Sequence, residues 1–292
     1  MYHNKQSYCV IIPSHKRVEM LKRALESVYQ QTLLPDAIYL VIDEPEDVEK
    51  YTFLEKFDER IRVSFTGGGC GGAKARNIGL DQSTEEFVFF LDDDDEWMAT
   101  KIEKQIALLD ARPDAVGVTC GRTELIAGKL KHVAVITDES RLNRRVRAEN
   151  LTGSFSQFGF RRAALPDIRL VDELSSAQDF EFYMRLTDHG RIVVVPECLI
   201  LYYRHGEGCV TGSLENKISA YRLINQLHSA DSTSYDLKYR TYRVDCIQLN
   251  SEISFINFLN LAARTTMRGV LFGEPILALK YVIKSIVVYF CR

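Results

Sequence analysis

The sequence lacks a long apolar run and lacks a large excess of charge of either sign. No uninterrupted stretch of its 292 residues reaches the ~18–20 apolar residues of a transmembrane helix, so we expect none. The start of the chain is polar and lacks the apolar core of a signal peptide, which predicts a cytoplasmic protein. The net charge of −3 gives no reason to expect binding to nucleic acid.

Paired cysteines are also missing. The seven cysteines are odd in number and scattered, and no two of them form a CxxC pair. This pattern is typical of a reducing compartment and argues against a zinc site. With 46% hydrophobic and 26% charged residues, the chain has the composition of a globular protein that can bury a sizeable core.

The most distinctive feature that is present is a run of four carboxylates, Asp92 to Asp95, directly after the apolar residues 87–91. Adjacent like charges repel, so such a run costs stability unless a cation or basic groups neutralise it. Mg²⁺ commonly binds through one or two carboxylates together with substrate phosphates. Because residues two apart in a strand point the same way, we expect Asp92 and Asp94 to share a target while Asp93 faces elsewhere. The alternative interpretation is a solvated acidic turn.

Strand and helix patterns alternate along the first 120 residues, which predicts an α/β fold with a mainly parallel sheet and helices on both faces. Ligands of such sheets lie beyond the carboxyl ends of the strands. Ser14, Asp43, the glycine run 67–72 and the acidic run all follow predicted strands, so we expect them at one edge of the sheet. Apolar strands are predicted at residues 8–13, 37–43, 60–66, 87–91 and 115–120.

After residue 120, strand and helix patterns alternate less regularly. A helix begins at Gln178, and two short strands follow at 192–195 and 199–203. Ser14 is expected to cap the helix after the first strand, and residues 100–103 have the form of a capping box. We divide the chain into three parts, residues 1–120, 121–215 and 216–292, of which the last is predicted to be helical.

Rival sites can be tested against the same motifs. Gly67, Gly69 and Gly72 satisfy GxGxxG, but they follow the third predicted strand, whereas a dinucleotide fingerprint follows the first. A P-loop is excluded because no Gly-Lys-Ser/Thr occurs. An EF-hand loop starting at Asp92 is excluded because Trp97 stands where the loop needs glycine. An aspartate nucleophile of phosphatase type stays open.

Several segments together resemble the family 2 glycosyltransferases of GT-A fold. Residues 10–17, Val-Ile-Ile-Pro-Ser-His-Lys-Arg, are similar to the opening signature of that family, and the resemblance covers about residues 8–205. The further segments that carry it are Leu25-Glu26-Ser27-Val28, Gln30-Gln31-Thr32, Asp43, Ala75-Arg76-Asn77-Ile78-Gly79, residues 90–95, Gln178-Asp179 and Tyr203-Arg204-His205.

The resemblance implies transfer of a sugar from a nucleotide diphosphate sugar, with inversion at the anomeric carbon. It assigns residues 1–120 to the nucleotide sugar and residues 121–215 to the acceptor. The base is expected at Pro13-Ser14-His15 and Asp43, with Arg76 near it, and the ribose at Asp92 or Asp93. Arg204 and His205 are expected to contact the diphosphate or to order a lid. The residues expected at the donor are Pro13, Ser14, His15, Arg17, Asp43, Lys74, Arg76, Asp92, Asp93, Arg204 and His205.

The resemblance also implies a metal ion and a general base. Asp94, together with Asp92, is expected to hold Mg²⁺ or Mn²⁺ against the diphosphate. Asp179 falls where the family places the base that takes a proton from the acceptor hydroxyl. Two alternatives stay open for the whole chain, a GT-A-like nucleotidyltransferase and a non-catalytic carbohydrate-binding relic.

The region after residue 215 lies outside the resemblance. Residues 216–292 carry ten Lys/Arg and five Asp/Glu, and the apolar segment 275–290 contains Lys280 and Lys284. This pattern suggests a helix resting on anionic lipid at the inner face of the cell membrane. Internal packing and a homodimer contact are equally open. On the membrane interpretation, the acceptor is a lipid-linked saccharide, as in surface polysaccharide assembly.

Overall fold

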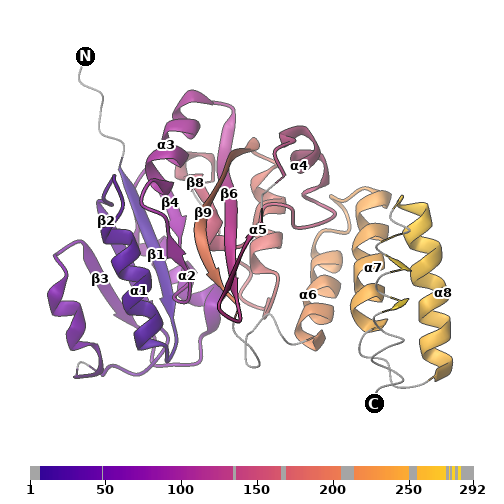
Figure 1. Ribbon diagram of the computed structural model, residues 1–292, viewed down its shortest axis with the longest axis horizontal. Coiled ribbons are helices and arrows are strands. Elements are labelled where there is room, and N and C mark those ends of the chain that lie inside the picture. Colours follow the sequence, from indigo (N-terminus) through magenta and orange to yellow (C-terminus); the bar gives the residue numbers. More distant parts are fainter. Residues whose placement is uncertain are drawn as a thin grey trace. The chain divides into compact units, whose positions relative to one another are not determined.

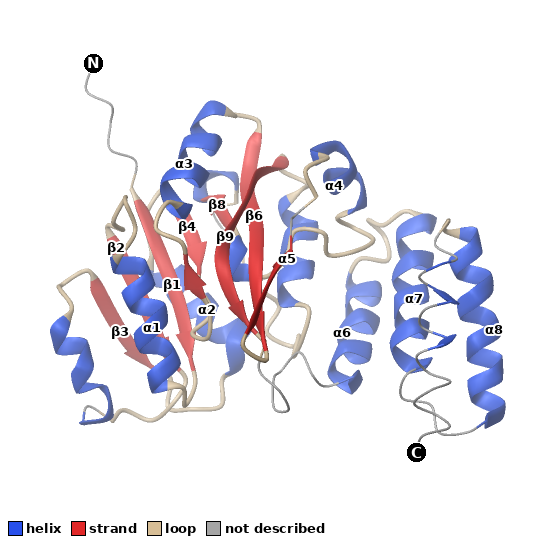
Figure 2. Ribbon diagram, viewed as in Figure 1, coloured by secondary structure: helices blue, strands red, loops and turns tan. Residues whose placement is uncertain are grey.

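The computed structural model describes residues 7–47, 49–133, 136–165, 169–204, 214–249 and 255–273, and positions 276, 278–279 and 282–283. The chain divides into two compact units, which are drawn in Figures 1 and 2 and are described separately. The first unit comprises Met1–Val146, Asn150–Glu173 and Gln178–Gly206. The second comprises Arg147–Glu149, Leu174–Ala177 and Glu207–Arg292.

The first unit is built on a mixed sheet whose described strands lie in the order β3-β2-β1-β4-β8-β6-β9-β5, with β7 paired to β6 (Figure 2). The pairs β1–β2, β2–β3, β1–β4 and β6–β9 are parallel. β8 runs antiparallel between β4 and β6. The predicted α/β fold with a mainly parallel sheet is confirmed. The strands are β1 (Tyr8–Ser14), β2 (Ala37–Ile42), β3 (Ile61–Phe65), β4 (Phe87–Phe90), β5 (Glu96–Trp97), β6 (Ala115–Ile126), β7 (Lys129–Val133), β8 (Gly159–Arg161) and β9 (Arg191–Tyr203).

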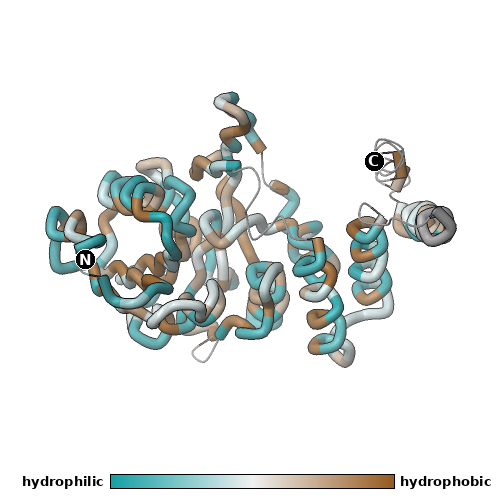
Figure 3. Tube along the Cα trace, turned by 90° about the horizontal axis from the view of Figure 1, so that it is seen from below, coloured by the Kyte–Doolittle hydropathy of each residue, from teal (hydrophilic) through white to brown (hydrophobic). Residues whose placement is uncertain are grey.

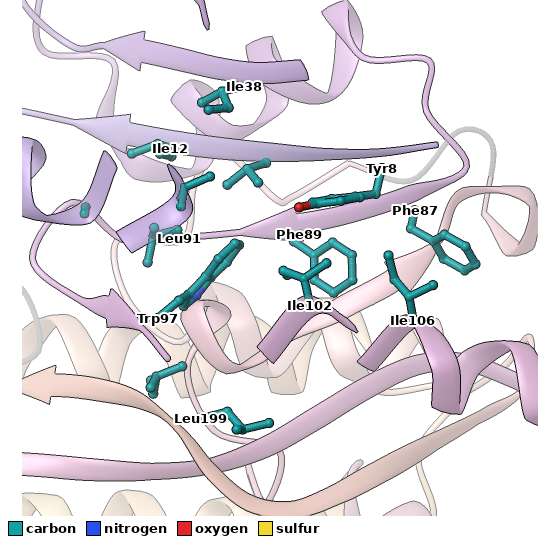
Figure 4. Close-up of a cluster of buried hydrophobic side chains, with 14 of the residues drawn as sticks. Tyr8, Ile12, Ile38, Phe87, Phe89, Leu91, Trp97, Ile102, Ile106 and Leu199 are labelled. Atoms are coloured by element: carbon teal, nitrogen blue, oxygen red, sulfur yellow. The ribbon is translucent and has the colours of Figure 1, made fainter. Parts of the chain in front are cut away.

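Helices cover both faces of this sheet because alternate strand residues point to opposite sides. Tyr8 and Ile12 of β1 lie in one apolar cluster with side chains of α1 and α3, which Figure 4 shows around Phe89 and Trp97. Cys9 lies in the other cluster, with side chains of α2, α4 and α5. The helices of this unit are α1 (Val18–Tyr29), η1 (Glu49–Lys56), α2 (Gly71–Gln82), α3 (Lys101–Ala111), α4 (Glu139–Arg145), η2 (Phe155–Gln157), η3 (Arg162–Ala164) and α5 (Gln178–Leu186).

Two strand predictions were too short. The strand predicted to end at residue 120 continues to Ile126, and the two strands predicted at 192–195 and 199–203 form the single strand β9. The register between β6 and β9 shifts where Cys120 pairs with Val195 and Gly121 pairs with Cys198. A bulge at this point accommodates Pro196, which has no N–H to donate to the ladder.

Both predicted helix caps were wrong. Ser14 lies within β1, and α1 begins at Val18 without a side-chain cap. The first turn of α3 also has no side-chain cap, and Glu103 instead accepts a hydrogen bond of 2.8 Å from Thr32. In each case a partner distant in sequence has taken the side chain that the local pattern assigned to the cap.

The second unit is helical in its described part, with α6 (Leu214–Leu227), α7 (Ser234–Leu249) and α8 (Phe255–Leu271). Hydrophilic and hydrophobic residues alternate along α6 and α7 in Figure 3. Fully buried Arg240 donates to Asn225 at 2.6 Å and to Ser232 at 2.8 Å. Among the helices that the structure describes, none is both long and apolar enough to span a membrane.

Candidate active site

The four consecutive carboxylates form a turn, not an extension of the strand. β4 ends at Phe90, and the N–H of Asp95 donates to the carbonyl of Asp92 at 3.1 Å. Strand alternation therefore does not apply, and Asp92 and Asp94 have different partners. Asp93 and Asp94 share Arg17, at 3.2 Å and 2.8 Å, so the prediction that Asp93 faces away was wrong.

The four carboxylates of this turn differ in their hydrogen-bond and ion-pair partners and in their burial. Asp92 pairs with Arg76 of α2. Asp93 accepts a hydrogen bond of 2.8 Å from the Ser14 hydroxyl at the end of β1. Burial raises the pKa of Asp93 to about 6, and the charges of Asp94 and Asp92 add to this rise, whereas the hydrogen bond from Ser14 and the charge of Arg17 oppose it. Burial also raises the pKa of Asp95 well above its usual value, and the charges of Asp92 and Asp94 act in the same direction.

Asp43, which follows β2, holds the glycine run in place. Its carboxylate accepts hydrogen bonds from the hydroxyl of Thr66 at 2.5 Å and from the N–H groups of Cys70 and Gly71 at 2.9 Å and 2.8 Å. The run needs glycine because residues 67, 68, 69 and 71 all have φ between 75° and 100°. The N–H groups at the start of α2 are thus already bound to an anion, which agrees with the rejection of a dinucleotide site there.

Asp179 lies at the start of α5 and is half-buried. Its Oδ1 accepts a hydrogen bond of 2.7 Å from the N–H of Phe180, and its Oδ2 accepts one of 3.0 Å from Asn150. Burial raises the pKa of Asp179 to about 6, although these two hydrogen bonds act in the opposite direction. A carboxylate with a pKa near neutrality is suited to accept a proton.

Arg76 joins the acidic turn to the start of α5. One guanidinium nitrogen pairs with Asp92, and another donates to the side chain of Gln178 at 3.2 Å. Its guanidinium also lies 4.6 Å from the ring centre of Phe155. The structure therefore brings together the acidic turn and the region of Asp179, which are separated by more than 80 residues in the sequence.

The other residues predicted to bind the nucleotide sugar lie in several different parts of the first unit. Pro13 lies in β1, and Nδ1 of His15 is 2.7 Å from the carbonyl oxygen of Asp43. Lys74 is exposed in the first turn of α2. Arg204 follows β9 and lies 3.4 Å from Glu124. His205 lies outside the described residues.

The residues expected to hold a metal ion supply the oxygen donors that Mg²⁺ and Mn²⁺ prefer. In the described part of the chain, no three His, Cys, Asp or Glu side chains are grouped as a metal site. Two carboxylates suffice where substrate phosphates and water complete the coordination. Asp92 and Asp94 fit such a site, provided that Arg76 and Arg17 turn from them toward the donor.

Two residues of this site were not singled out individually from the sequence. Ser156 accepts a hydrogen bond from the N–H of Asp92 at 3.0 Å, and it lies in residues 151–160, whose mixture of glycine, serine and aromatic residues is typical of a loop that lines a site. Asn150 donates to Asp179, and it stands three residues before Gly153. Asn and Gly at this spacing are a turn signal, which would have placed Asn150 in a tight turn but not beside Asp179.

Comparison with known sequences identifies the family. Residues 9–169, more than half of the chain, match the family described as glycosyl transferase family 2. The chain belongs to glycosyl transferase family 2. The matched segment contains β1 to β4, the glycine run and the acidic turn, whereas Asp179 lies beyond its end.

Named relatives match this chain over shorter segments. The Escherichia coli protein WfgD, named as a UDP-Glc:α-D-GlcNAc-diphosphoundecaprenol β-1,3-glucosyltransferase, is 32% identical over 100 residues, which is 34% of this chain and 40% of WfgD. The Bacillus subtilis protein TuaG, named as a teichuronic acid biosynthesis glycosyltransferase with the qualifier "putative", is 33% identical over 113 residues, 38% of this chain and 44% of TuaG. The matches thus span less than half of either relative.

Solved structures share the fold over nearly the whole chain. The S. aureus TarS 1-349 structure in complex with UDP-GlcNAc has a TM-score of 0.67 at 19% identity, covering 97% of this chain and 89% of TarS 1-349. The Pyrobaculum calidifontis mannosyltransferase PcManGT, in complex with GDP-Man and Mn²⁺, has a TM-score of 0.57 at 14% identity, covering 97% of this chain and 86% of PcManGT. At these identities the likeness establishes the GT-A type fold alone.

Proposed function

We propose that this chain is an inverting glycosyltransferase that moves a sugar from a UDP-sugar to a saccharide or lipid-linked saccharide in surface polysaccharide biosynthesis. Membership of glycosyl transferase family 2 supports the class of reaction. The names of WfgD and TuaG support a polysaccharide product, and the UDP complexes of TarS support the nucleotide.

The observation that carries the proposal is the bridge through Arg76. Because Arg76 contacts both Asp92 and Gln178, a donor at the acidic turn and a base at Asp179 belong to one site. A direct displacement needs this arrangement, since the leaving diphosphate and the incoming hydroxyl must act on the same anomeric carbon from opposite sides. One displacement inverts that carbon, so no covalent nucleophile is required.

On this proposal, each residue of the site has a separate role in the reaction. Asp179 takes the proton from the acceptor hydroxyl as its oxygen attacks the anomeric carbon. Asp92 and Asp94 would hold Mg²⁺ or Mn²⁺, which would supply positive charge to offset that of the leaving diphosphate. Ser14 and Asp93 are hydrogen-bonded to each other at the end of β1, where the nucleoside is expected. Arg17 and Arg76 carry guanidinium groups suited to bind a diphosphate once they leave their carboxylates.

The test is release of UDP from UDP-glucose and UDP-GlcNAc with Mn²⁺, with and without a saccharide acceptor. Asp179→Asn and Asp94→Asn should each lower turnover by about 10²-fold or more. Asp110→Asn is the matched control because Asp110 is exposed on α3 and should leave turnover unchanged. Full turnover in both site variants would remove the assignment.

Two rival functions have different readouts. A nucleotidyltransferase would release pyrophosphate from a nucleoside triphosphate and a sugar phosphate, which the proposed enzyme would not do. A non-catalytic carbohydrate-binding relic would show no metal-dependent binding of UDP in calorimetry. We propose the transferase above both because the chain keeps separate carboxylates for the donor and the base.

The second unit leaves the membrane and homodimer alternatives open. The apolar residues Met267, Val270 and Leu271 of α8 are 68%, 61% and 78% exposed, whereas most of the predicted segment 275–292 lies outside the described residues. Two measurements distinguish the alternatives: sedimentation with anionic vesicles, and the mass of the protein in solution as a function of its concentration. Binding that is lost on deletion of residues 275–292 would support a peripheral position at the inner face of the membrane, and a concentration-dependent doubling of mass would support the homodimer.

A further inference from the structure

The carboxylate of Asp179 is held by one donor on each oxygen. The N–H of Phe180 belongs to the same helix and accompanies the base in any conformation of α5. Asn150 comes from a separate segment, 29 residues earlier in the chain, and its Nδ2 donates to Oδ2 at 3.0 Å. This second contact fixes the rotation of the Asp179 side chain relative to another part of the fold.

Asn150 is itself held at both ends of its amide. Its Oδ1 accepts the N–H groups of Thr152 and Gly153 at 3.2 Å and 3.1 Å, and its Nδ2 also donates to the carbonyl of Gly153 at 3.1 Å. Two N–H groups on one end identify that end as the oxygen, so the nitrogen faces Asp179. Gly153 has a φ of 101°, and a Cβ there would lie 2.3 Å from the side-chain oxygen of Gln157. The turn therefore presents the donor in one orientation.

Other groups near Asp179 do not replace this contact. The charge of Asp92 opposes ionisation of Asp179, and the charge of Arg76 favours it. The hydroxyl of Tyr183, one turn further along α5, is fully buried and has no hydrogen-bond partner in the described part of the chain. Among these groups, Asn150 alone makes a direct side-chain hydrogen bond to Asp179.

We propose that Asn150 is a positioning residue for the base, holding the Asp179 carboxylate in one orientation and favouring its charged, proton-accepting form. This inference rests on the proposed function, in which Asp179 is the base. Asn150 does not touch the reacting atoms, so its removal should act through Asp179.

The first test measures Asp179 directly, in the full chain without substrate. The protein is labelled with ¹³C at the aspartate carboxyl, and Asp179 is assigned by its loss in Asp179→Asn. In Asn150→Ser the pKa of Asp179 should rise by about 0.5–1 unit, since a hydrogen bond to the charged form is lost. In Asn150→Asp it should rise by more than about 1 unit, because a like charge is added while the acceptor oxygen of the turn is kept.

Asn143 is the matched control. It is also half-buried, and its side chain bridges Glu139 and Ile192 without any contact to Asp179. Asn143→Ser should leave the titration of Asp179 unchanged. Should Asn150→Ser lose the turn and fail to fold, Asn150→Asp still decides. An unchanged pKa of Asp179 in the folded Asn150 variants overturns the proposal.

The second test follows release of UDP from UDP-glucose as a function of pH. Asn150→Ser should move the acidic limb of kcat upward by the shift seen in the titration, leave KM for the donor within about twofold, and regain rate at higher pH. A shifted titration with an unmoved limb would also overturn the positioning role. If Asp179→Asn retains turnover, the proposed function fails, and the titration still decides whether Asn150 controls Asp179.

Discussion

Replacing Asp43 by asparagine should destabilise the first unit by about 2 kcal/mol at neutral pH. The carboxylate accepts hydrogen bonds from Thr66, Cys70 and Gly71, and these bonds hold the glycine run against the start of α2. Asparagine has nearly the same size but offers one acceptor oxygen and one amide nitrogen. The nitrogen would face an N–H or O–H donor, so at least one of these bonds is lost.

The magnitude follows from the pKa of Asp43. Burial alone raises this pKa, but the three hydrogen bonds lower it from 3.8 to about 2. Because the folded-state pKa lies below the unfolded one, the stabilisation is present above pH ~4 and is lost as pH falls through the folded value. A difference of nearly 2 units corresponds to about 2 kcal/mol at pH 7 and to roughly half of that at pH 3. The effect of the substitution should therefore shrink by roughly half over this range.

Urea denaturation followed by tryptophan fluorescence measures this effect. Trp97 is the single tryptophan of the chain and is buried in the same unit as Asp43, so its emission reports the unfolding of that unit. Asp58→Asn is the control: Asp58 accepts comparable hydrogen bonds from Tyr29 and Arg60 but is exposed. Its substitution should cost less than about 1 kcal/mol, because water replaces the lost partners.

Two results would refute the reasoning for Asp43. The first is an Asp43→Asn variant as stable as the wild type at pH 7. The second is a destabilisation that stays constant between pH 7 and pH 3, since that would mean that the hydrogen bonds do not depend on the charge of the carboxylate.

Three further predictions follow from the pKa values and charges of the first unit. The rate of sugar transfer should fall as pH drops below about 6, because Asp179 must be charged to accept a proton. If Asp179→Asn keeps some activity and its rate falls over the same pH range, this assignment is contradicted. Burial lowers the pKa of Lys101 to about 8, so between pH 8 and 10.5 this residue binds a proton in the unfolded chain but not in the folded one, and its own contribution to the free energy of unfolding rises across that range. Cys120 contributes with the opposite sign, because burial raises its pKa. The difference in free energy of unfolding between the wild type and Lys101→Met in urea titrations should therefore rise from pH 8 to 10.5, and a constant difference would refute the assignment to Lys101. Chelation with EDTA should stop UDP release, and added Mn²⁺ should restore it. The melting temperature of the protein, followed by the fluorescence of Trp97, should not change; a fall of several degrees would mean that the metal supports the fold.

The fold could be predicted where burial alone determines the pattern. β1, β2 and β4 are buried on both faces, and such strands are continuous apolar runs in the sequence. β9 was divided in two because Pro196 looks like an end of a strand, and only the register with β6 shows that a bulge absorbs it. Pairing across a sheet is not visible in a local pattern.

The site could be predicted as a set of segments but not as a set of contacts. Acids and glycines after strands indicated which segments meet at the edge of the sheet, because parallel strands end on the same side. The partner of each side chain depended on residues far away: Arg17 and Asp94 are separated by 77 positions, and Ser14 and Asp93 by 79. Asn150 was missed for the same reason, since its turn is local but its contact with Asp179 is not.

The charge of the acidic turn is much smaller in the fold than in the sequence. Arg76 forms an ion pair with Asp92, and Arg17 forms ion pairs with both Asp93 and Asp94. Burial favours the neutral form of Asp95. The sequence argument that four adjacent carboxylates need a cation or basic groups is therefore satisfied by the chain itself. A cation at this turn would have to compete with two arginines, and a diphosphate would compete for the same arginines. Donor and cation should consequently bind far better together than either does alone, since each releases the groups that the other requires.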